Sequence, residues 1–181
     1  GGATGMIGDP SGKSEERTLN TLDTIEEFKK GIMSQIESIV DTACTDNLSW
    51  VSQIDMITFL RDFGKHFSVN AMLGKESVRQ RVDRNDQGIS FTEFSYMLLQ
   101  AMDFLKLNEN QNCQLQIGGS DQWGNITAGT DLIRRVKGSD TDAFGLTIPL
   151  ITNSEGKKFG KTESGAVWLD SELTSPFQSL F

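Results

Sequence analysis

Three polar side chains share one face of a segment that is otherwise largely apolar, residues 90–106. Tyr96, Gln100 and Asp103 stand at positions i, i+4 and i+7, so at about 100° per residue they fall within roughly 60° of one another on a helix. Such a row can hold a small ligand that carries both a cationic group and a hydroxyl group. A solvent-facing stripe is the alternative, but the rest of the helix surface is unusually apolar for it. We therefore predict a buried helix that contributes a polar pocket wall.

A glycine-rich segment opens the sequence, with glycines at positions 1, 2, 5, 8 and 12. Glycines let the backbone approach a ligand closely, and exposed N–H groups suit phosphate. The alternative is a Walker A loop, but that motif needs glycine where Ile7 stands, and Pro10 removes an N–H group that a phosphate cradle uses. The segment therefore favours a ligand-binding loop of another kind.

A stretch that begins at Asp83 resembles a calcium-binding EF-hand loop, because Gly88 falls at its sixth position. The twelfth position needs a bidentate glutamate, and Phe94 stands there instead. Glu93 is one residue early and forms a helix-capping box with Ser90. Calcium binding is therefore disfavoured. We expect no protein-bound metal site, because the single histidine and the two separated cysteines show no ligand spacing either.

Two loops carry the remaining candidate chemistry. In the first, Asp121 can accept hydrogen bonds from ribose hydroxyl groups, while Gly118 and Gly119 allow a base or sugar to approach. A sharp strand-to-helix turn capped by Asn125 is the alternative. In the second, residues 157–165, two lysines flank a glycine and can clamp polyphosphate as point charges. An ordinary charged loop is the alternative there.

The hydrophobic pattern predicts the elements that must position these side chains. A capping box at Thr24–Glu27 opens an amphipathic helix to about Ala43, and a second at Ser90–Glu93 opens the apolar helix to about Lys106. The other elements expected are helices over residues 56–63, 76–84 and 126–136 and strands over residues 115–117 and 146–151. Strand, loop, helix and strand in this order predict a parallel α/β sheet, whose ligands bind beyond the carboxyl ends of the strands.

Charge and composition limit the classes of protein. The chain has 181 residues, a formal net charge of −8 and no apolar run near the roughly 20 residues that span a bilayer. No secretory signal opens it, and two separated cysteines indicate free thiols in a reducing compartment. An acidic chain must meet nucleic acid through a local basic region. The candidates, with solvated basic stretches as the alternative, are Arg134, Arg135 and Lys137, and Lys157, Lys158 and Lys161.

Four segments, in their order along the chain, resemble the bacterial-type tyrosyl-tRNA synthetases, which are class I aminoacyl-tRNA synthetases. Lys158-Phe-Gly-Lys161-Thr162 is similar to the KMSKS signature in its K-F-G-K-[ST] form. The run from Gln116 to Thr127, which reads QIGGSDQWGNIT, is specific to this family, and Gly1–Arg17 and Ser90–Asp103 match it as well.

The resemblance implies an α/β fold: a Rossmann-like parallel sheet with flanking helices and a helical connective insertion, truncated at both ends. A partial catalytic domain would span residues 1–177, with the connective and dimer region at about residues 50–85 and a truncated tail at residues 178–181. The implied activity is that of a tyrosine–tRNA ligase, which activates tyrosine with ATP and transfers it to tRNA(Tyr). ATP would be a substrate and bring Mg²⁺, and the protein would form a homodimer with no membrane partner. Bacterial cytoplasm is the implied location, with a mitochondrion or plastid as the alternative.

The resemblance also assigns site residues. Those that would bind tyrosine are Thr4, Asp9, Tyr96, Gln100, Asp103, Gln116 and Gln122. Those that would bind ATP are Gly118, Gly119, Asp121 and Lys161. Those that would stabilise the pyrophosphate leaving group are Lys158, Lys161 and Thr162, helped by Lys13 and Arg17. Among these residues, Asp103 would recognise the phenolic hydroxyl group. Its presence favours tyrosine over the indole substrate of the related tryptophan enzymes.

Two departures from the family limit what the chain is expected to do. The HIGH motif, which lies upstream of Gly1 in the family, is missing, and His66 does not replace it. The anticodon-binding region downstream of Pro176 is missing too. We therefore expect the isolated chain to catalyse little. A catalytically incomplete module that binds ligands or dimerises is the alternative function.

Overall fold

A parallel β–α–β unit forms the centre of the computed structural model, which describes residues 1–10, 19–75, 78–79, 82–83, 88–150 and 172. Strands β1 (Leu115–Gly119) and β2 (Phe144–Ile148) pair in parallel, and helix α8 (Trp123–Lys137) connects them. In this register Leu115 lies opposite Phe144 and Gly119 lies opposite Ile148. The predicted order of strand, loop, helix and strand is confirmed.

The boundaries of this unit differ from the predicted ones for local reasons. The strand predicted over residues 146–151 begins earlier, at Phe144, and ends at Ile148, because Pro149 cannot donate to the ladder. Position 151 lies outside the described residues. Helix α8 begins earlier than expected, at Trp123, after the 3₁₀ turn η3 (Ser120–Gln122). Asn125 is therefore not the helix cap: it lies inside α8, and Gln122 holds the N-cap position.

Helix α7 (Phe91–Gln111) is the buried helix predicted from the apolar segment. Ser90 is its N-cap, and its hydroxyl oxygen accepts a hydrogen bond from the Glu93 N–H group over 3.3 Å, as the capping box predicts. The helix runs on past Lys106 and ends where Asn112 adopts a left-handed conformation with φ 52°. Its apolar side packs mainly against α8. The fully buried side chains at this contact are those of Met102, Phe104, Leu105, Leu132 and Ile133.

Helix α2 (Leu22–Val40) begins before the predicted capping box, so the expectation for Thr24 as its cap is wrong. Thr21 offers the same hydroxyl group one turn earlier, and its oxygen accepts a hydrogen bond from the Thr24 N–H group over 3.3 Å. The helix ends at Val40 because Asp41 adopts a left-handed conformation with φ 49°. Ile25 is its one buried side chain among the residues the structure describes there.

The predicted helix over residues 56–63 forms, but its hydrogen-bond spacing changes along its length. It starts as α4 (Met56–Thr58), capped by the Asp55 carboxylate, and continues as a π-helical segment, η1 (Phe59–Phe63). A 3₁₀ turn, η2 (Gly64–His66), and helix α5 (Val69–Leu73) follow. Of the helix predicted over residues 76–84, the helical positions that the structure describes are 78, 79 and 82, and the gaps between them lie outside the described residues.

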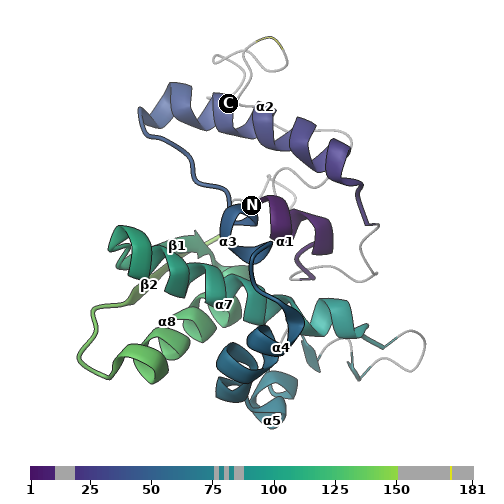
Figure 1. Ribbon diagram of the computed structural model, residues 1–181, viewed down its shortest axis with the longest axis vertical. Coiled ribbons are helices and arrows are strands. Elements are labelled where there is room, and N and C mark those ends of the chain that lie inside the picture. Colours follow the sequence, from purple (N-terminus) through teal and green to yellow (C-terminus); the bar gives the residue numbers. More distant parts are fainter. Residues whose placement is uncertain (11–18, 76–77, 80–81, 84–87, 151–171, 173–181) are drawn as a thin grey trace.

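Figure 1 shows how the elements are layered. Helices α7 and α8 lie side by side, with α4 and α5 below them and the long helix α2 across the top. Two short helices, α1 (Gly2–Ile7) and α3 (Leu48–Val51), lie between α2 and α7. Helix α1 contacts α2, α3 and α7. The chain therefore places its glycine-rich first residues at the junction of three other helices.

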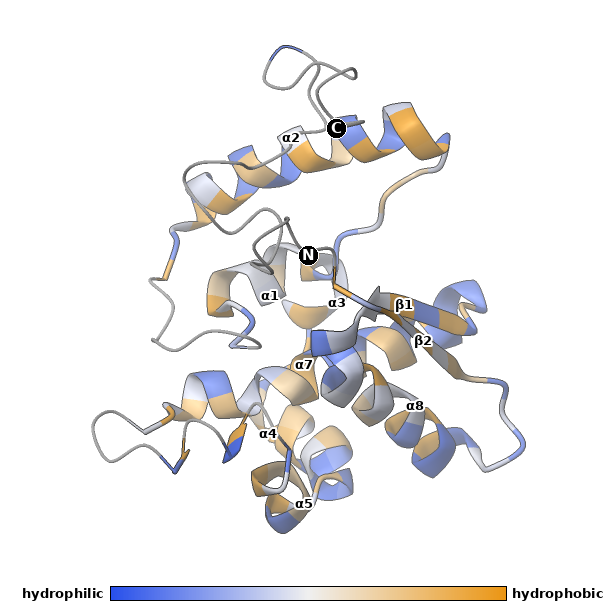
Figure 2. Cartoon of the chain, turned by 180° about the vertical axis from the view of Figure 1, so that it is seen from behind, coloured by the Kyte–Doolittle hydropathy of each residue, from blue (hydrophilic) through white to orange (hydrophobic). Residues whose placement is uncertain are grey.

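One face of the small sheet packs against α8, and the opposite face is apolar and about half exposed. The side chains on that face are Leu115, Ile117, Phe144, Leu146 and Ile148. The orange on the two strands in Figure 2 marks their hydrophobic residues. In α/β folds both faces of a parallel sheet are normally covered. Across the described part of the chain, no helix combines the length and the apolar character needed to cross a membrane.

Candidate active site

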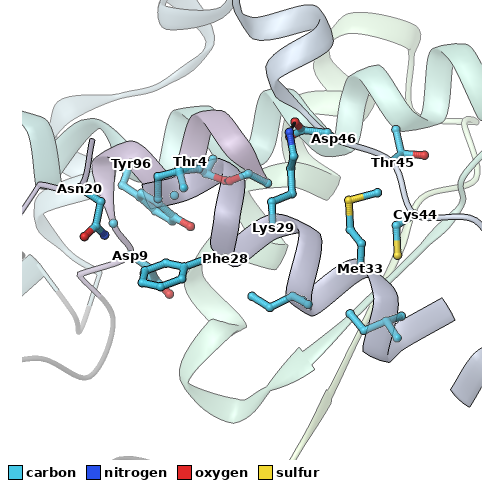
Figure 3. A pocket seen from close by; sticks show the side chains of 16 residues that line it. Thr4, Asp9, Asn20, Phe28, Lys29, Met33, Cys44, Thr45, Asp46 and Tyr96 are labelled. Carbon is cyan, nitrogen blue, oxygen red and sulfur yellow. Dashed lines mark hydrogen bonds and ion pairs between the residues drawn. The ribbon is translucent and has the colours of Figure 1, made fainter. Parts of the chain in front are cut away.

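A cavity of about 510 Å³ opens between α1, α2, α7 and the segment 44–46. Figure 3 shows Thr4, Asp9 and Tyr96 gathered at one end of this cavity, and Met33 and Cys44 at the other. The first three are predicted ligand-binding residues from two segments that are far apart in the sequence. A cavity of this volume, lined by both polar and apolar side chains, has the dimensions of a small-molecule site.

The start of α1 is held by side chains from a distant segment. The Gly2 N–H group donates to Asp46 Oδ1 over 2.6 Å, and the Ala3 N–H group donates to Asn47 Oδ1 over 2.9 Å. These two side chains satisfy N–H groups that an α-helix leaves without an internal partner. A Cβ atom at Gly1 would lie 2.4 Å from Asn47 Oδ1, so a larger residue there would displace the Asn47 side chain from its present position.

Asp103 receives hydrogen bonds on both of its carboxylate oxygens. Asn47 Nδ2 donates to Oδ2 over 2.6 Å, and the indole Nε1–H of Trp50 donates to Oδ1 over 2.9 Å. Asn47 Nδ2 also donates to Thr4 Oγ1 over 3.0 Å, which joins Asp103 to the cavity wall. Burial raises the pKa of Asp103 above its ordinary value, and the hydrogen bonds from Asn47 and Trp50 oppose that rise.

Sequence reasoning did not find Asn47 or Trp50. They precede Asp103 by 56 and 53 positions, and they come from a short helix whose polar residues show no periodic pattern. A buried carboxylate does require donors, so the prediction of Asp103 in a pocket wall implied partners without naming them. Tyr96, Gln100 and Asp103 are all partly buried on α7, as the predicted row requires. Of these three residues Tyr96 lines the cavity, and the place of Gln100 and Asp103 in a pocket wall stays a prediction.

The loop after α1 meets the loop after β1. Gln122 Nε2 donates to Asp9 Oδ2 over 2.6 Å, although the two residues are 113 positions apart. Asn125 Nδ2 donates in turn to Gln122 Oε1 over 3.2 Å, which orients the amide. Gly8, with φ 83°, provides the turn that directs the chain to Asp9. Two predicted tyrosine-binding residues are thus in direct contact.

Gln116 lies farther from these contacts. Its side-chain oxygen is buried between β1 and α8, 3.5 Å from where a Cβ atom at Gly129 would be. It is not among the residues that line the cavity. Its predicted support of the pocket therefore stays a prediction, and it would act through the packing of α8 on β1.

The end of β1, where the chain enters the turn η3, leaves little room for side chains on its two glycines. A Cβ atom at Gly119 would lie 2.7 Å from Leu150 Cδ2 and 2.8 Å from Asp121 Oδ1, and one at Gly118 would lie 3.1 Å from Gln122 Cβ. The turn interpretation of this loop is therefore correct as far as the backbone is concerned. Ribose binding by Gly118, Gly119 and Asp121 stays a prediction, and it is compatible with this geometry because the turn lies at the carboxyl end of β1.

The predicted phosphate-binding side chains lie outside the described residues. They are Lys13, Arg17, Lys158, Lys161 and Thr162.

The basic cluster near the end of α8 makes contacts within the protein. Arg134 donates to the Ala143 carbonyl oxygen over 3.3 Å, and Arg135 donates to the His66 carbonyl oxygen over 2.7 Å. Lys137 donates to the side-chain oxygen of Asn108. These contacts fix the end of α8 against α7, the turn η2 and the segment before β2, and they bring three positive charges to the end of α8. His66 lies beside them and away from the cavity, and burial, Lys65 and Arg135 lower its pKa.

The fold and the site together define a class: an α/β protein with a parallel sheet whose strand end adjoins a polar small-molecule pocket. The chain belongs to the family of class I tRNA synthetases that comprises the tryptophan and tyrosine enzymes, whose family model matches residues 1–180.

Within this family, the chain is similar to tyrosine–tRNA ligases. It is 58% identical to the enzyme of Geobacillus stearothermophilus and 57% identical to that of Chromobacterium violaceum, and each match covers 98% of this chain and 43% of the relative. Among solved structures, a C-terminally truncated mitochondrial tyrosyl-tRNA synthetase of Aspergillus nidulans matches with a TM-score of 0.71 and 30% identity. That match covers 98% of this chain and 55% of the other. The chain thus spans less than half the length of the curated relatives it matches.

Proposed function

We propose that this chain is the tyrosine-activating part of a tyrosine–tRNA ligase. The observation that carries the proposal is the Asp103 carboxylate, held by Asn47 and Trp50 on the same helix face as Tyr96 and linked through Asn47 to the cavity wall. The similarity to tyrosine–tRNA ligases over 98% of the chain supports it.

Selection of tyrosine follows from the cost of an unsatisfied buried carboxylate. Asp9, Tyr96 and Gln100 would hold the ammonium group, with Thr4 beside them, and Asp103 would accept a hydrogen bond from the phenolic hydroxyl group. A carboxylate has about four acceptor positions, so the donors Asn47 and Trp50 leave capacity for a ligand. Phenylalanine would remove water from Asp103 without replacing the hydrogen bond, and that penalty discriminates against it.

Activation of tyrosine would use ATP as a substrate, and Mg²⁺ would arrive with its triphosphate. The tyrosine carboxylate attacks the α-phosphate, which gives tyrosyl-adenylate and releases pyrophosphate. A terminal ribose hydroxyl of tRNA then attacks the tyrosyl carbonyl carbon of the adenylate, which forms the tRNA ester and releases AMP. Gln122, fixed by Asp9 and Asn125, would orient the tyrosine carboxylate.

The protein's part in this reaction is positioning and charge stabilisation, because tyrosine itself supplies the nucleophile. Gly118, Gly119 and Asp121 would bind the adenosine ribose at the end of β1. The residues that would stabilise the developing charge on pyrophosphate are Lys158, Lys161, Thr162, Lys13 and Arg17.

A homodimer is the assembly that we propose for the connective region, residues 50–85. Large apolar side chains are exposed on its helices and on the first residue of α7, and exposure of this kind marks protein–protein interfaces. They are Met56, Ile57, Leu60, Val69, Leu73, Val82 and Phe91. Phe91 is 76% exposed and Met56 is 74% exposed, so both side chains offer apolar surface to a partner.

tRNA would meet the protein at local positive charge, since the chain as a whole is acidic. The candidates among the described residues lie together at the end of α8 and are Arg134, Arg135 and Lys137.

Bacterial cytoplasm is the compartment we propose, because the curated relatives are bacterial. An organellar location is the alternative, favoured by the similarity to a mitochondrial synthetase structure.

Exchange of radiolabelled pyrophosphate into ATP tests the proposal directly. On the longest natural form of the protein, we expect exchange that depends on tyrosine and not on tryptophan or phenylalanine. Exchange with tryptophan alone would assign the chain to the other branch of the family. Absence of exchange with any amino acid, while tyrosine still binds, would favour the catalytically incomplete module.

A further inference from the structure

Asp46 joins three helices and has no part in the chemistry proposed above. Its Oδ1 atom accepts hydrogen bonds from the Gly2 N–H group at the start of α1 and, over 3.2 Å, from the Leu48 N–H group at the start of α3. Its Oδ2 atom lies 2.8 Å from Nζ of Lys29 on α2. The side chains of Lys29 and Asp46 are only 21% and 20% exposed, so water screens this ion pair less than it screens a surface pair.

The residue that follows Asp46 lies in the recognition site. The side-chain oxygen of Asn47 accepts a hydrogen bond from the Ala3 N–H group. The side-chain nitrogen of Asn47 is then oriented to donate to Asp103 and Thr4. This orientation depends on the segment 46–47 keeping its register against the first turn of α1. The bond from Gly2 to Asp46 and the bond from Ala3 to Asn47 together set that register.

Lys29 adds an electrostatic contribution to this arrangement. After burial, which has the larger effect, the negative charge of Asp46 is one of the influences that raise the pKa of Asp103. Lys29 offsets that charge and at the same time connects α2 to the start of α1. Figure 3 shows Lys29 reaching from α2 to Asp46 across the upper wall of the cavity.

We propose that Asp46, held by Lys29, is a positioning residue for recognition of the tyrosine hydroxyl group: it fixes Asn47, and Asn47 orients Asp103. This inference rests on the proposed function and adds to it a specificity element contributed by α2. If Asp46 served only as a helix cap, its loss would lower stability and leave the choice of amino acid unchanged.

Steady-state pyrophosphate exchange on the longest natural form of the protein tests the proposal, with tyrosine and phenylalanine compared. The variants are Asp46→Asn, which keeps the shape of the side chain and removes its charge, and Lys29→Met. We expect KM for tyrosine to rise about tenfold with kcat nearly unchanged, because the hydroxyl contact exists in both the ground and transition states. The preference for tyrosine over phenylalanine should fall by a similar factor, and Lys29→Arg should restore both values.

Two matched controls lie on the same helix. Glu26→Gln removes the other carboxylate that pairs with Lys29, and Lys30→Met removes an exposed neighbouring ammonium group. Both should behave as wild type. If KM for tyrosine and the amino-acid preference of Asp46→Asn and Lys29→Met stay within about twofold of wild type, the proposal is overturned.

A readout without catalysis separates this inference from the proposed function. The Trp50 indole N–H donates to Asp103, so its NMR resonance, assigned with Trp50→Phe, reports the position of that carboxylate. It should shift in Asp46→Asn and Lys29→Met and stay in place in Glu26→Gln. A wild-type protein without exchange would refute the proposed function, whereas an indole resonance unmoved in both variants would refute the positioning role.

Discussion

At the scale of single residues, Asp103 combines partial burial with two hydrogen bonds that favour its ionised form. Its pKa is raised by burial, and the donors Asn47 and Trp50 reduce the cost of keeping the charge. A further hydrogen-bond donor lowers the free energy of a partly buried carboxylate more than it lowers that of a carboxylate in water. Asp103 is therefore suited to distinguish two ligands that differ only in a hydroxyl group.

Replacing Asp103 with Asn should lower kcat/KM for tyrosine by at least about tenfold and reduce the preference over phenylalanine. The new amide would present a nitrogen to a site that already contains the donors Asn47 and Trp50, so one donor would lose its acceptor. Exchange kinetics with both amino acids provide the measurement. Asp131→Asn, on the exposed side of α8, is the control, and an Asp103 variant with an unchanged tyrosine preference would contradict the assignment.

At the scale of elements, the pair of Asp46 and Lys29 should make stability depend on pH. Burial alone would raise the pKa of Asp46, but hydrogen bonds from Lys29, Gly2 and Leu48 hold it below its ordinary value. A carboxyl group of this kind contributes stability above its unfolded pKa and loses that contribution as the pH falls through the folded value. The Tm difference between wild type and Asp46→Asn, a few degrees near neutral pH, should therefore shrink below about pH 4.

Thermal unfolding followed by circular dichroism across this pH range checks the expectation. Asp140→Asn, in the exposed loop before β2, is the matched control and should show no such trend. A difference that grows as the pH falls would mean that the Asp46 carboxylate is destabilising, contrary to its hydrogen bonds.

The start of α7 offers a second test at this scale. Ser90→Ala removes the hydroxyl oxygen that caps the Glu93 N–H group and should lower the free energy of unfolding by about 1 kcal/mol. Urea denaturation gives the measurement, and Ser139→Ala in an exposed loop is the control. A loss well below 0.5 kcal/mol, roughly the lower limit for such caps, would show that Glu93 or water takes over the capping role.

The elements also explain which features the sequence could predict. The row of Tyr96, Gln100 and Asp103 was predictable because helical spacing is local, and so was the Ser90 cap. The start of α2 was not, because Thr21 and Thr24 offer the same hydroxyl group and only packing selects between them. Contacts such as that of Asn47 with Asp103 depend on the tertiary fold, and no local pattern encodes them.

At the scale of the whole molecule, two of the exposed apolar surfaces have different meanings. One is the outer face of β1 and β2, which a complete α/β sheet would cover. The other is formed by exposed side chains of the connective region and by Phe91 at the start of α7. The short helices α4 and α5 of that region lie away from the sheet (Figure 1). The curated relatives extend well beyond this chain, so their additional segments are available to cover the first surface, while a second copy is our proposal for the other.

Replacing Phe91 with Asp should disrupt this homodimer. A carboxylate introduced at an apolar interface would be desolvated without a partner, and we expect the dimer dissociation constant to rise by at least about a hundredfold. Sedimentation equilibrium on the longest natural form gives the measurement. Ile39→Asp, at a position on α2 that is 60% exposed and outside the connective region, is the control and should leave the assembly unchanged. A Phe91→Asp protein that still sediments as a dimer at micromolar concentration would place the interface elsewhere.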